Sequence, residues 1–192
     1  MTPAFGRSSG SRPLDLLNTL DWRDDPARRT ELLSTAGALS RWARQAGVAA
    51  PLARAIRHEA QRRRAIRLRE TLASLFRAVA EGRPLPTAAA AAFTRATQEA
   101  WRHRELTDPG GSPDWRWHRR TTPADRLLGD LVLEAAALLV SPLASRVRIC
   151  EGEGCGWFFV DRSKAGRRRW CSMAACGNRV KVRQYRRRVA RG

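Results

Sequence analysis

The stretch CEGEGCGWFFVDRSKAGRRRWCSMAACGNRVKVRQYRRR, residues 150–188, contains all four cysteines of this 192-residue chain. They form two like-spaced pairs, Cys150-x4-Cys155 and Cys171-x4-Cys176, with 15 residues between the pairs. Zinc prefers four thiolates at about 2.3 Å in a tetrahedron, and each short paired loop supplies two of them. The pattern therefore predicts one structural Zn²⁺ held by Cys150, Cys155, Cys171 and Cys176.

Other uses of the cysteines fit the pattern less well. Two disulfides would require an exported protein, and the N-terminal stretch shows no apolar run typical of a signal peptide. A redox pair is more often C-x-x-C at the start of a helix in a βαβ unit. A catalytic zinc leaves one position open and uses His or carboxylate ligands, whereas four thiolates close the shell. We expect a soluble, cytoplasmic, bacterial protein with a structural metal.

Positive charge is concentrated around the cysteines. The chain has a net charge of +19, and residues 150–192 hold 12 basic and 3 acidic side chains. A charge of this sign and size favours a polyanion, which is nucleic acid or an anionic membrane surface. A membrane is disfavoured because the most apolar segment, residues 127–140, carries Asp130 and Glu134, and the basic helix lacks a broad apolar face. We expect double-stranded DNA as the partner and a location at the bacterial nucleoid.

The pattern upstream of the cysteines predicts a mainly α-helical domain over residues 13–145, after a flexible N-terminus at residues 1–12. Apolar residues recur at helical spacing, and glycine and proline mark the ends of the periodic segments. The segment 102–119 instead alternates around the turn signal DPGGSP and predicts a β-hairpin. The predicted helices are 14–26, 32–46, 51–81, 87–101 and 123–140.

The third predicted unit, residues 146–192, combines a zinc knuckle, a hairpin and a basic helix. GWFFVDRS and RRRWC read as paired strands, and Trp157, Phe159 and Trp170 would supply a small apolar core. From Asn178, a predicted helix cap, the chain reads as a helix whose Val182, Tyr185 and Val189 face the zinc core or the body. Its opposite face carries Arg183, Arg187 and Arg191. The arrangement is typical of a treble-clef-like finger.

Basic side chains of the finger divide into two candidate nucleic-acid contacts. Those of the loop would position phosphates, and those of the helix would reach phosphates or base edges. Arg179 has an equal alternative, which is to bond the loop backbone or the Asp161 carboxylate. The loop candidates are Arg162, Lys164, Arg167, Arg168 and Arg169, and the helix candidates are Arg179, Lys181, Arg183, Arg186, Arg187 and Arg188.

The segment 150–188 resembles the CGNR zinc-finger family, named for the motif seen here as Cys176 to Arg179. LDLLNTLDWR, LSRWARQAG, LRETLASLF and DWRWH look like the helical ABATE domain that commonly precedes this finger. The resemblance covers the chain from about Leu14. It implies a bacterial transcription regulator whose finger binds DNA.

The helical domain has two competing interpretations. Polar and aromatic residues of one short stretch, with two neighbours, could sense a small ligand, or they could serve the core and helix caps. The candidate ligand residues are Asn18, Asp21, Trp22, Arg23, Trp42 and Arg69. The domain could instead be a dimerisation scaffold giving a homodimer, and RNA is the rival of DNA as partner. We expect no enzyme activity, because the three histidines lack metal or catalytic spacing.

Overall fold

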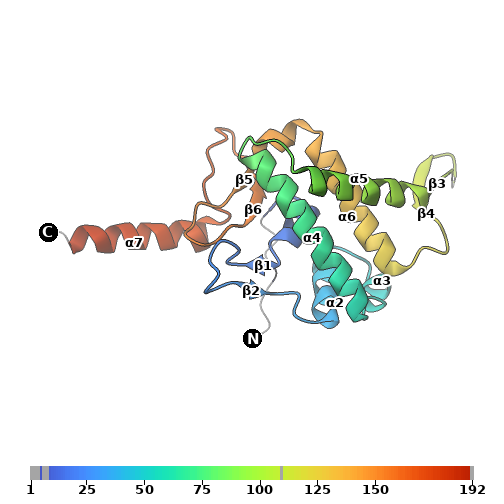
Figure 1. Ribbon diagram of the computed structural model, residues 1–192, viewed down its shortest axis with the longest axis horizontal. Helices are drawn as coiled ribbons and strands as arrows, with labels where there is room; N and C mark the ends of the chain where they lie inside the picture. Colours follow the sequence, from blue (N-terminus) through green and yellow to red (C-terminus); the bar gives the residue numbers. More distant parts are fainter. Residues whose placement is uncertain (1–4, 6–8, 109, 191–192) are drawn as a thin grey trace.

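The computed structural model describes residue 5, residues 9–108 and residues 110–190, and these are mainly helical (Figure 1). The helices are α1 (Arg12–Leu17), α2 (Ala36–Gln45), α3 (Ala50–Arg54), α4 (Glu59–Ala80), α5 (Thr87–Arg102), α6 (Pro123–Leu139) and α7 (Asn178–Val189). Three antiparallel pairs join them: β1 (Leu20–Asp21) with β2 (Thr30–Glu31), β3 (Arg104–Thr107) with β4 (Asp114–Trp117), and β5 (Val147–Ile149) with β6 (Phe158–Val160). A 3-10 turn, η1 (Pro142–Arg146), precedes β5, and a π turn, η2 (Met173–Gly177), precedes α7. The predicted fold class is confirmed.

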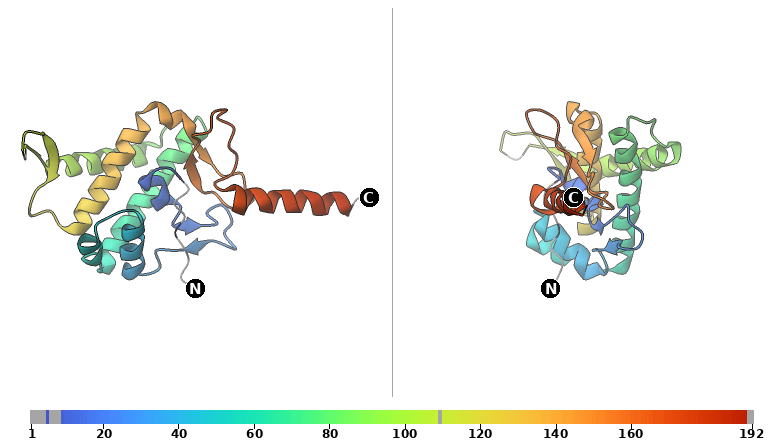
Figure 2. Two further views of the ribbon diagram at one scale, coloured as in Figure 1. Left: turned by 180° about the vertical axis from the view of Figure 1, so that it is seen from behind. Right: turned by 90° about the vertical axis from the view of Figure 1, so that its left-hand side faces the viewer.

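The short helix α1 lies at the centre of the body and contacts α4, α6 and β6 (Figures 1 and 2). Its Leu14, Leu16 and Leu17 are completely buried, and each buried leucine stabilises the fold by about 1.5–3 kcal/mol. One core cluster gathers α2, α3 and the first turns of α6 around Trp42. A second cluster gathers α1, α4, α6 and the β5–β6 pair around Phe76. The strands of the finger therefore belong to the core of the body.

The predicted hairpin is present as β3 and β4, with Arg104 opposite Trp117. The ring of Trp117 packs against α6, where a Cβ on Gly129 would come within 2.2 Å of it. The indole nitrogen of Trp117 donates to Asp130 at 2.9 Å. This packing explains why a glycine is kept inside a helix, where it costs about 1 kcal/mol relative to alanine.

Two predicted helices differ from the structure. The helix predicted over 14–26 ends at Leu17, because the Asn18 amide turns away to bond both backbone groups of Phe158. The long helix predicted over 51–81 is broken into α3 and α4 between Arg54 and Glu59. The side chain of Gln61 accepts from the backbone N–H of His58 at 2.9 Å, and α4 starts anew there.

The predicted pairing within the finger is also wrong in part. RRRWC forms no strand, and β6 pairs instead with β5, which precedes the first cysteine. The opposite edge of β6 is bonded by the N-terminal segment, since Val160 N donates to the Ser9 carbonyl at 2.8 Å. Local alternation could not reveal this, because both partners of β6 lie outside the segment between the cysteine pairs.

The N-terminal prediction and the domain limits have different outcomes. Much of the predicted flexible segment 1–12, together with Arg191, lies outside the described residues. Of the part described, Ser9 is fully buried and donates its hydroxyl to Asp15 at 2.6 Å. The division of the chain at residues 145 and 146 stays a prediction.

Candidate metal centre and basic helix

The four cysteine sulfurs converge on one buried point of the finger. All four lie within 4.8 Å of one another, with Cys155 to Cys171 at 3.8 Å and Cys171 to Cys176 at 3.6 Å. A tetrahedron with metal–sulfur bonds of about 2.3 Å has sulfur–sulfur edges of about 3.8 Å. A disulfide would need a bond of about 2.05 Å. The sulfur positions therefore match a closed tetrahedral zinc site, and the predicted structural Zn²⁺ is confirmed.

The backbone of the first knuckle is folded around its own ligand. The amide nitrogens of Gly152 and Cys171 donate to the Cys150 sulfur at 3.4 and 3.3 Å. A Cβ on Gly152 would lie 3.0 Å from the Cys176 sulfur, so no larger residue fits there without a shift of its neighbours. These amides offset the negative charge of a thiolate, as bonds to a charged form do.

The four thiols lie close enough together for one cation to bind all of them. Hydrogen bonds from Cys155 and Cys171 lower the pKa of Cys150 to about 2. The same bonds to Cys150 raise the pKa of Cys155 and of Cys171 above the ordinary value. A bound Zn²⁺ would supply the positive charge that keeps four closely spaced sulfurs in the thiolate form. The bound zinc would contribute to the free energy of folding rather than to a reaction, because four thiolate ligands leave no coordination position for a substrate.

Arg179, the last residue of the CGNR motif, links the metal site to the body. Its guanidinium donates to the Cys176 sulfur at 2.9 Å and lies over the Trp22 ring at 4.5 Å. Arg28 lies 3.8 Å from the centre of the same ring. The structural contacts of Arg179 are therefore Cys176 and Trp22 and not the predicted Asp161, whose carboxylate accepts from Ser163 and from the Arg168 amide. The predicted nucleic-acid contact of Arg179 stays a prediction.

The loop 22–28 of the body packs directly on the first knuckle. The amide nitrogens of Arg23 and Asp24 donate to the carbonyls of Cys155 and Gly154 at 3.1 and 3.3 Å. A Cβ on Gly154 would come within 2.6 Å of Asp25, and both Gly154 and Gly156 have positive φ. The glycines of the knuckle therefore serve two needs, the turn itself and the close approach of this loop.

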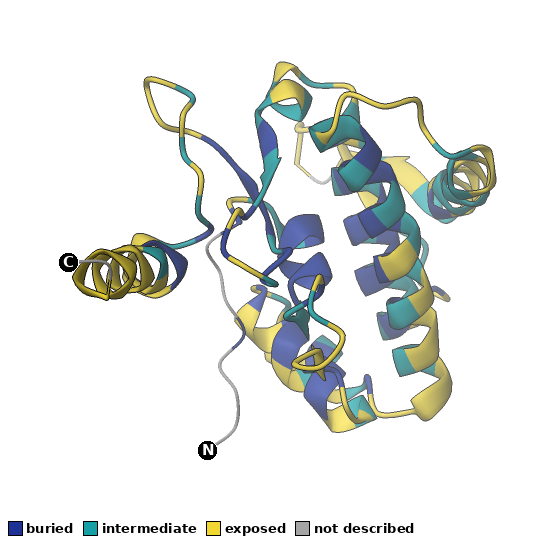
Figure 3. Cartoon of the chain, turned by 60° about the vertical axis from the view of Figure 1, so that its left-hand side comes forward, coloured by how far each residue is buried: buried dark blue, intermediate teal, exposed yellow. Residues whose placement is uncertain are grey.

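The helix α7 projects from the metal site away from the body (Figures 1 and 2). None of its described residues is buried (Figure 3). Val182, Tyr185 and Val189, predicted to face the core, are exposed by 50%, 67% and 63%, so that prediction is wrong. The predicted cap is also corrected: Asn178 is already helical, and Ser172 caps the preceding π turn.

The predicted nucleic-acid residues of α7 keep their charge on the surface. Arg183 pairs with Glu153 of the first knuckle. Arg183 and Arg187 both line a groove between α7 and the loop 22–28. Lys181, Arg186 and Arg188 are exposed. Among these described residues, Arg183 is paired with a carboxylate, whereas Lys181, Arg186, Arg187 and Arg188 are exposed basic side chains of α7.

The predicted phosphate-binding residues of the loop are divided between structural and surface roles. Arg168 donates to the carbonyls of Trp170 and Cys171 and lies over the Phe159 ring at 4.4 Å. Arg169 pairs with Glu151 at 2.6 Å, and Arg162 donates to the Gly10 carbonyl at 3.3 Å. Lys164 and Arg167 are exposed.

Most of the predicted ligand residues are instead bonded within the body. Arg69 is 2% exposed, meets Glu31 at 2.6 Å and Glu70 at 2.7 Å, and Arg23 also pairs with Glu70. Burial acts to lower the pKa of Arg69, but the bonds to Glu31 raise it overall, whereas burial lowers the pKa of Arg23. Asn18 is bonded to β6, Asp21 accepts from the Trp22 amide, and Trp42 lies in the core. Trp22 lines the groove beside α7.

The comparisons with known proteins agree with this architecture. Residues 10–142 match the family model ABATE, described as "Putative stress-induced transcription regulator", and residues 146–189 match the CGNR zinc finger. A search of curated proteins finds no match. Within the ranges that the structure describes, no helix is both long and apolar enough to cross a membrane.

Proposed function

Because this chain belongs to the ABATE family and ends in a CGNR zinc finger, we propose that it regulates transcription by binding duplex DNA through α7. The observation that carries the proposal is the exposure of α7. This helix extends away from the metal site, and none of its described residues is buried (Figure 3). A helix of 12 residues is only marginally stable by itself. Arg179, Arg183 and Arg187 also repel one another at i, i+4 spacing. Such a helix gains stability when a polyanion neutralises it.

Duplex DNA fits the dimensions and charge of α7. The major groove is about 12 Å wide and admits an α-helix. Arginine forms bidentate hydrogen bonds with guanine edges and with phosphates. Each neutralised phosphate releases counterions, so binding weakens steeply with salt. The zinc site would hold the first turn of α7 in place through Cys176 and Arg179.

Paired substitutions on α7 test the proposal. Arg183→Ala with Arg187→Ala should reduce the slope of log K against log salt by about 2, if each removes one phosphate contact. The matched control is Arg54→Ala with Arg57→Ala, which removes the same charge from exposed sites at and just after α3. The proposal is wrong if the two double variants lower the slope equally, or if neither does.

RNA is a second candidate because of Tyr185, whose ring is 67% exposed on α7. An exposed ring can stack on an unpaired base. The half-buried Trp157 and Trp170 are less suited, because both pack on the metal cluster. Competition between random duplex and single-stranded pools decides between the two, and a preference for single strands that Tyr185→Ala abolishes would establish RNA.

The structural feature that supports ligand sensing by the body is a groove, and it lies at a different site from the predicted one. An apolar groove of about 1130 Å³ between α4, α5 and α6 is lined by Phe93 and Trp101. A thermal-shift screen of metabolites tests it, with Phe93→Ala to abolish a response and Trp22→Ala to test the original site. No response across a broad library would favour a scaffold, and measurement of the mass in solution would identify a homodimer. We propose no catalytic role.

A further inference from the structure

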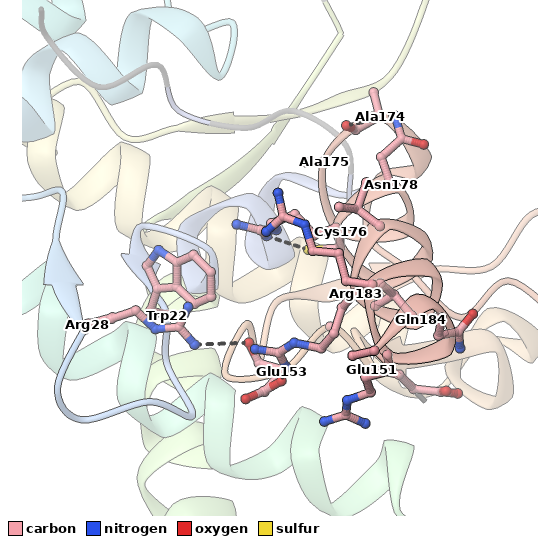
Figure 4. A pocket seen from close by; sticks show the side chains of 17 residues that line it. Trp22, Arg28, Glu151, Glu153, Ala174, Ala175, Cys176, Asn178, Arg183 and Gln184 are labelled. Atoms are coloured by element: carbon pink, nitrogen blue, oxygen red, sulfur yellow. Dashed lines mark hydrogen bonds and ion pairs between the residues drawn. The ribbon is translucent and has the colours of Figure 1, made fainter. Parts of the chain in front are cut away.

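We infer that the loop 22–28 of the body and α7 together hold a backbone phosphate of the DNA, in the groove between them (Figure 4). The inference rests on the proposed function and deepens it, because it makes the helical body part of the nucleic-acid interface. The groove has a volume of about 820 Å³. Its walls come from segments some 150 residues apart in sequence, Trp22 and Arg28 on one side and α7 on the other.

The groove gathers guanidiniums from both walls. Arg28, which also pairs with Asp25, lies on the side of the body, and four arginines lie on the side of α7: Arg179, Arg183, Arg186 and Arg187. Two carboxylates, those of Glu151 and Glu153, also line it. The balance is positive, and a two-sided set of arginines suits a phosphate better than a flat basic surface does, because its oxygens can be bonded from opposite directions.

Glu153 marks the position of the anion. Its carboxylate is paired with Arg183, although Glu153 sits on the tip of the first knuckle with its side chain 65% exposed. An exposed ion pair of this kind contributes little to stability. A phosphate can therefore displace Glu153 from Arg183, and the carboxylate occupies the place of a phosphate oxygen until DNA arrives.

Trp22 positions the two arginines rather than a base. Arg28 and Arg179 lie over its ring at 3.8 and 4.5 Å, so the ring is committed to cation–π contacts. Trp22 also has φ of 51°, the only positive value of a non-glycine residue in the described part of the chain. Left-handed backbone at a bulky residue is unfavourable and persists where its surroundings enforce it, as at binding sites. Here the bonds of the next two amides to the knuckle enforce it.

Arg28 gives the decisive experiment. In the zinc-loaded full chain, Arg28→Gln should reduce the salt slope of duplex binding by about 1, the value expected for one lost phosphate contact. Arg28→Lys should keep the wild-type slope, because it keeps the charge while losing most of the stack on Trp22. If both variants lose the slope equally, Arg28 acts on loop structure and the inference is wrong. It is also wrong if Arg28→Gln binds like wild type.

Glu153 provides an independent check with the opposite sign. Glu153→Gln should tighten duplex binding by up to about fivefold, which is the equivalent of about 1 kcal/mol. Weaker or unchanged binding would overturn its role as the displaced anion. The variant pair on α7 keeps the two proposals apart: a reduced slope for Arg183→Ala with Arg187→Ala but a normal one for Arg28→Gln refutes only the shared groove. If neither changes the slope, DNA reading by α7 fails with it.

Discussion

The core of the body and the helix α7 use the same residue, arginine, in opposite ways. In the body Arg69 is 2% exposed and bonded to Glu31 and Glu70, and Arg104 donates to Asp130 at 2.7 Å. In α7 the arginines are exposed, and their one recorded carboxylate partner in the described structure is Glu153. The basic residues that give the net charge of +19 therefore have different roles in the two regions. The buried arginine Arg69 bonds parts of the body to one another, whereas the exposed arginines of α7 are accessible to an external anion.

The two regions also differ in what holds them folded. The body has two clusters of buried side chains with Trp42, Phe76 and several leucines fully buried. Around the metal site, the finger has only a small cluster of four cysteines and Phe159, flanked by half-buried Trp157 and Trp170. Hydrophobic burial can carry the first region, whereas the second needs the metal.

Removal of zinc should produce the largest difference in stability between the two regions. Structural zinc contributes about 10–16 kcal/mol of binding free energy in small fingers, so chelation or Cys171→Ser should unfold residues 161–190. The body should keep its helices, because α1, α4 and α6 pack on one another independently of the thiolates. Hydrogen exchange checks this: protection should vanish in α7 and persist in α4. Simultaneous loss in both would show that the metal also holds the body.

Within the body, the buried arginine network should give the next largest effect. Arg69→Met removes the arginine that Glu31 pairs with and one of the two arginines that pair with Glu70, and breaking a buried pair costs about 3–5 kcal/mol. We expect about 3 kcal/mol, because both carboxylates reach solvent. Denaturant unfolding measures it. Arg67→Met, at an exposed position of the same helix, is the control and should change stability by less than about 0.5 kcal/mol.

The sequence predicts the elements of this fold better than their contacts. The spacing of the cysteines identifies the metal site, and α5, α6 and the β3–β4 hairpin follow from periodicity, a Thr122 cap and a turn signal. Periodicity could not place Asn18 beside Phe158, since their pairing joins residues 140 positions apart. It could not find the Trp22 and Arg179 contact either, because the charge of Arg179 gives no sign of its partner. Exposed Val182, Tyr185 and Val189 mimic a buried stripe.

Acid should also affect the finger before the body. Burial acts to raise the pKa of Glu70, but its hydrogen bond to Arg23 lowers it overall. A carboxyl with a depressed folded pKa stabilises above its unfolded value of about 4.3, and loses this only as pH falls through the folded value. Zinc affinity falls as thiolates protonate. In one acid titration, zinc release should therefore precede loss of the helical signal, and coincident transitions would contradict it.

The smallest expected effect is a gain of helix in α7 on binding. Repulsion among its arginines should leave its last turn frayed in the free protein, and phosphates remove that repulsion. Circular dichroism of the protein at 222 nm, with duplex subtracted, should show a gain of a few helical residues. Arg183→Ala with Arg187→Ala should reduce this gain, whereas Arg54→Ala with Arg57→Ala should preserve it.

The central claim, that the zinc-held helix reads the polyanion while the body is folded without the metal, is tested most directly by duplex binding across a salt series before and after chelation. The zinc-loaded chain should bind with a steep salt slope. The chelated chain should lose most of that slope and affinity while its body remains helical. Undiminished binding by a chelated chain with an unfolded finger would contradict the account, because the body would then carry the nucleic-acid site.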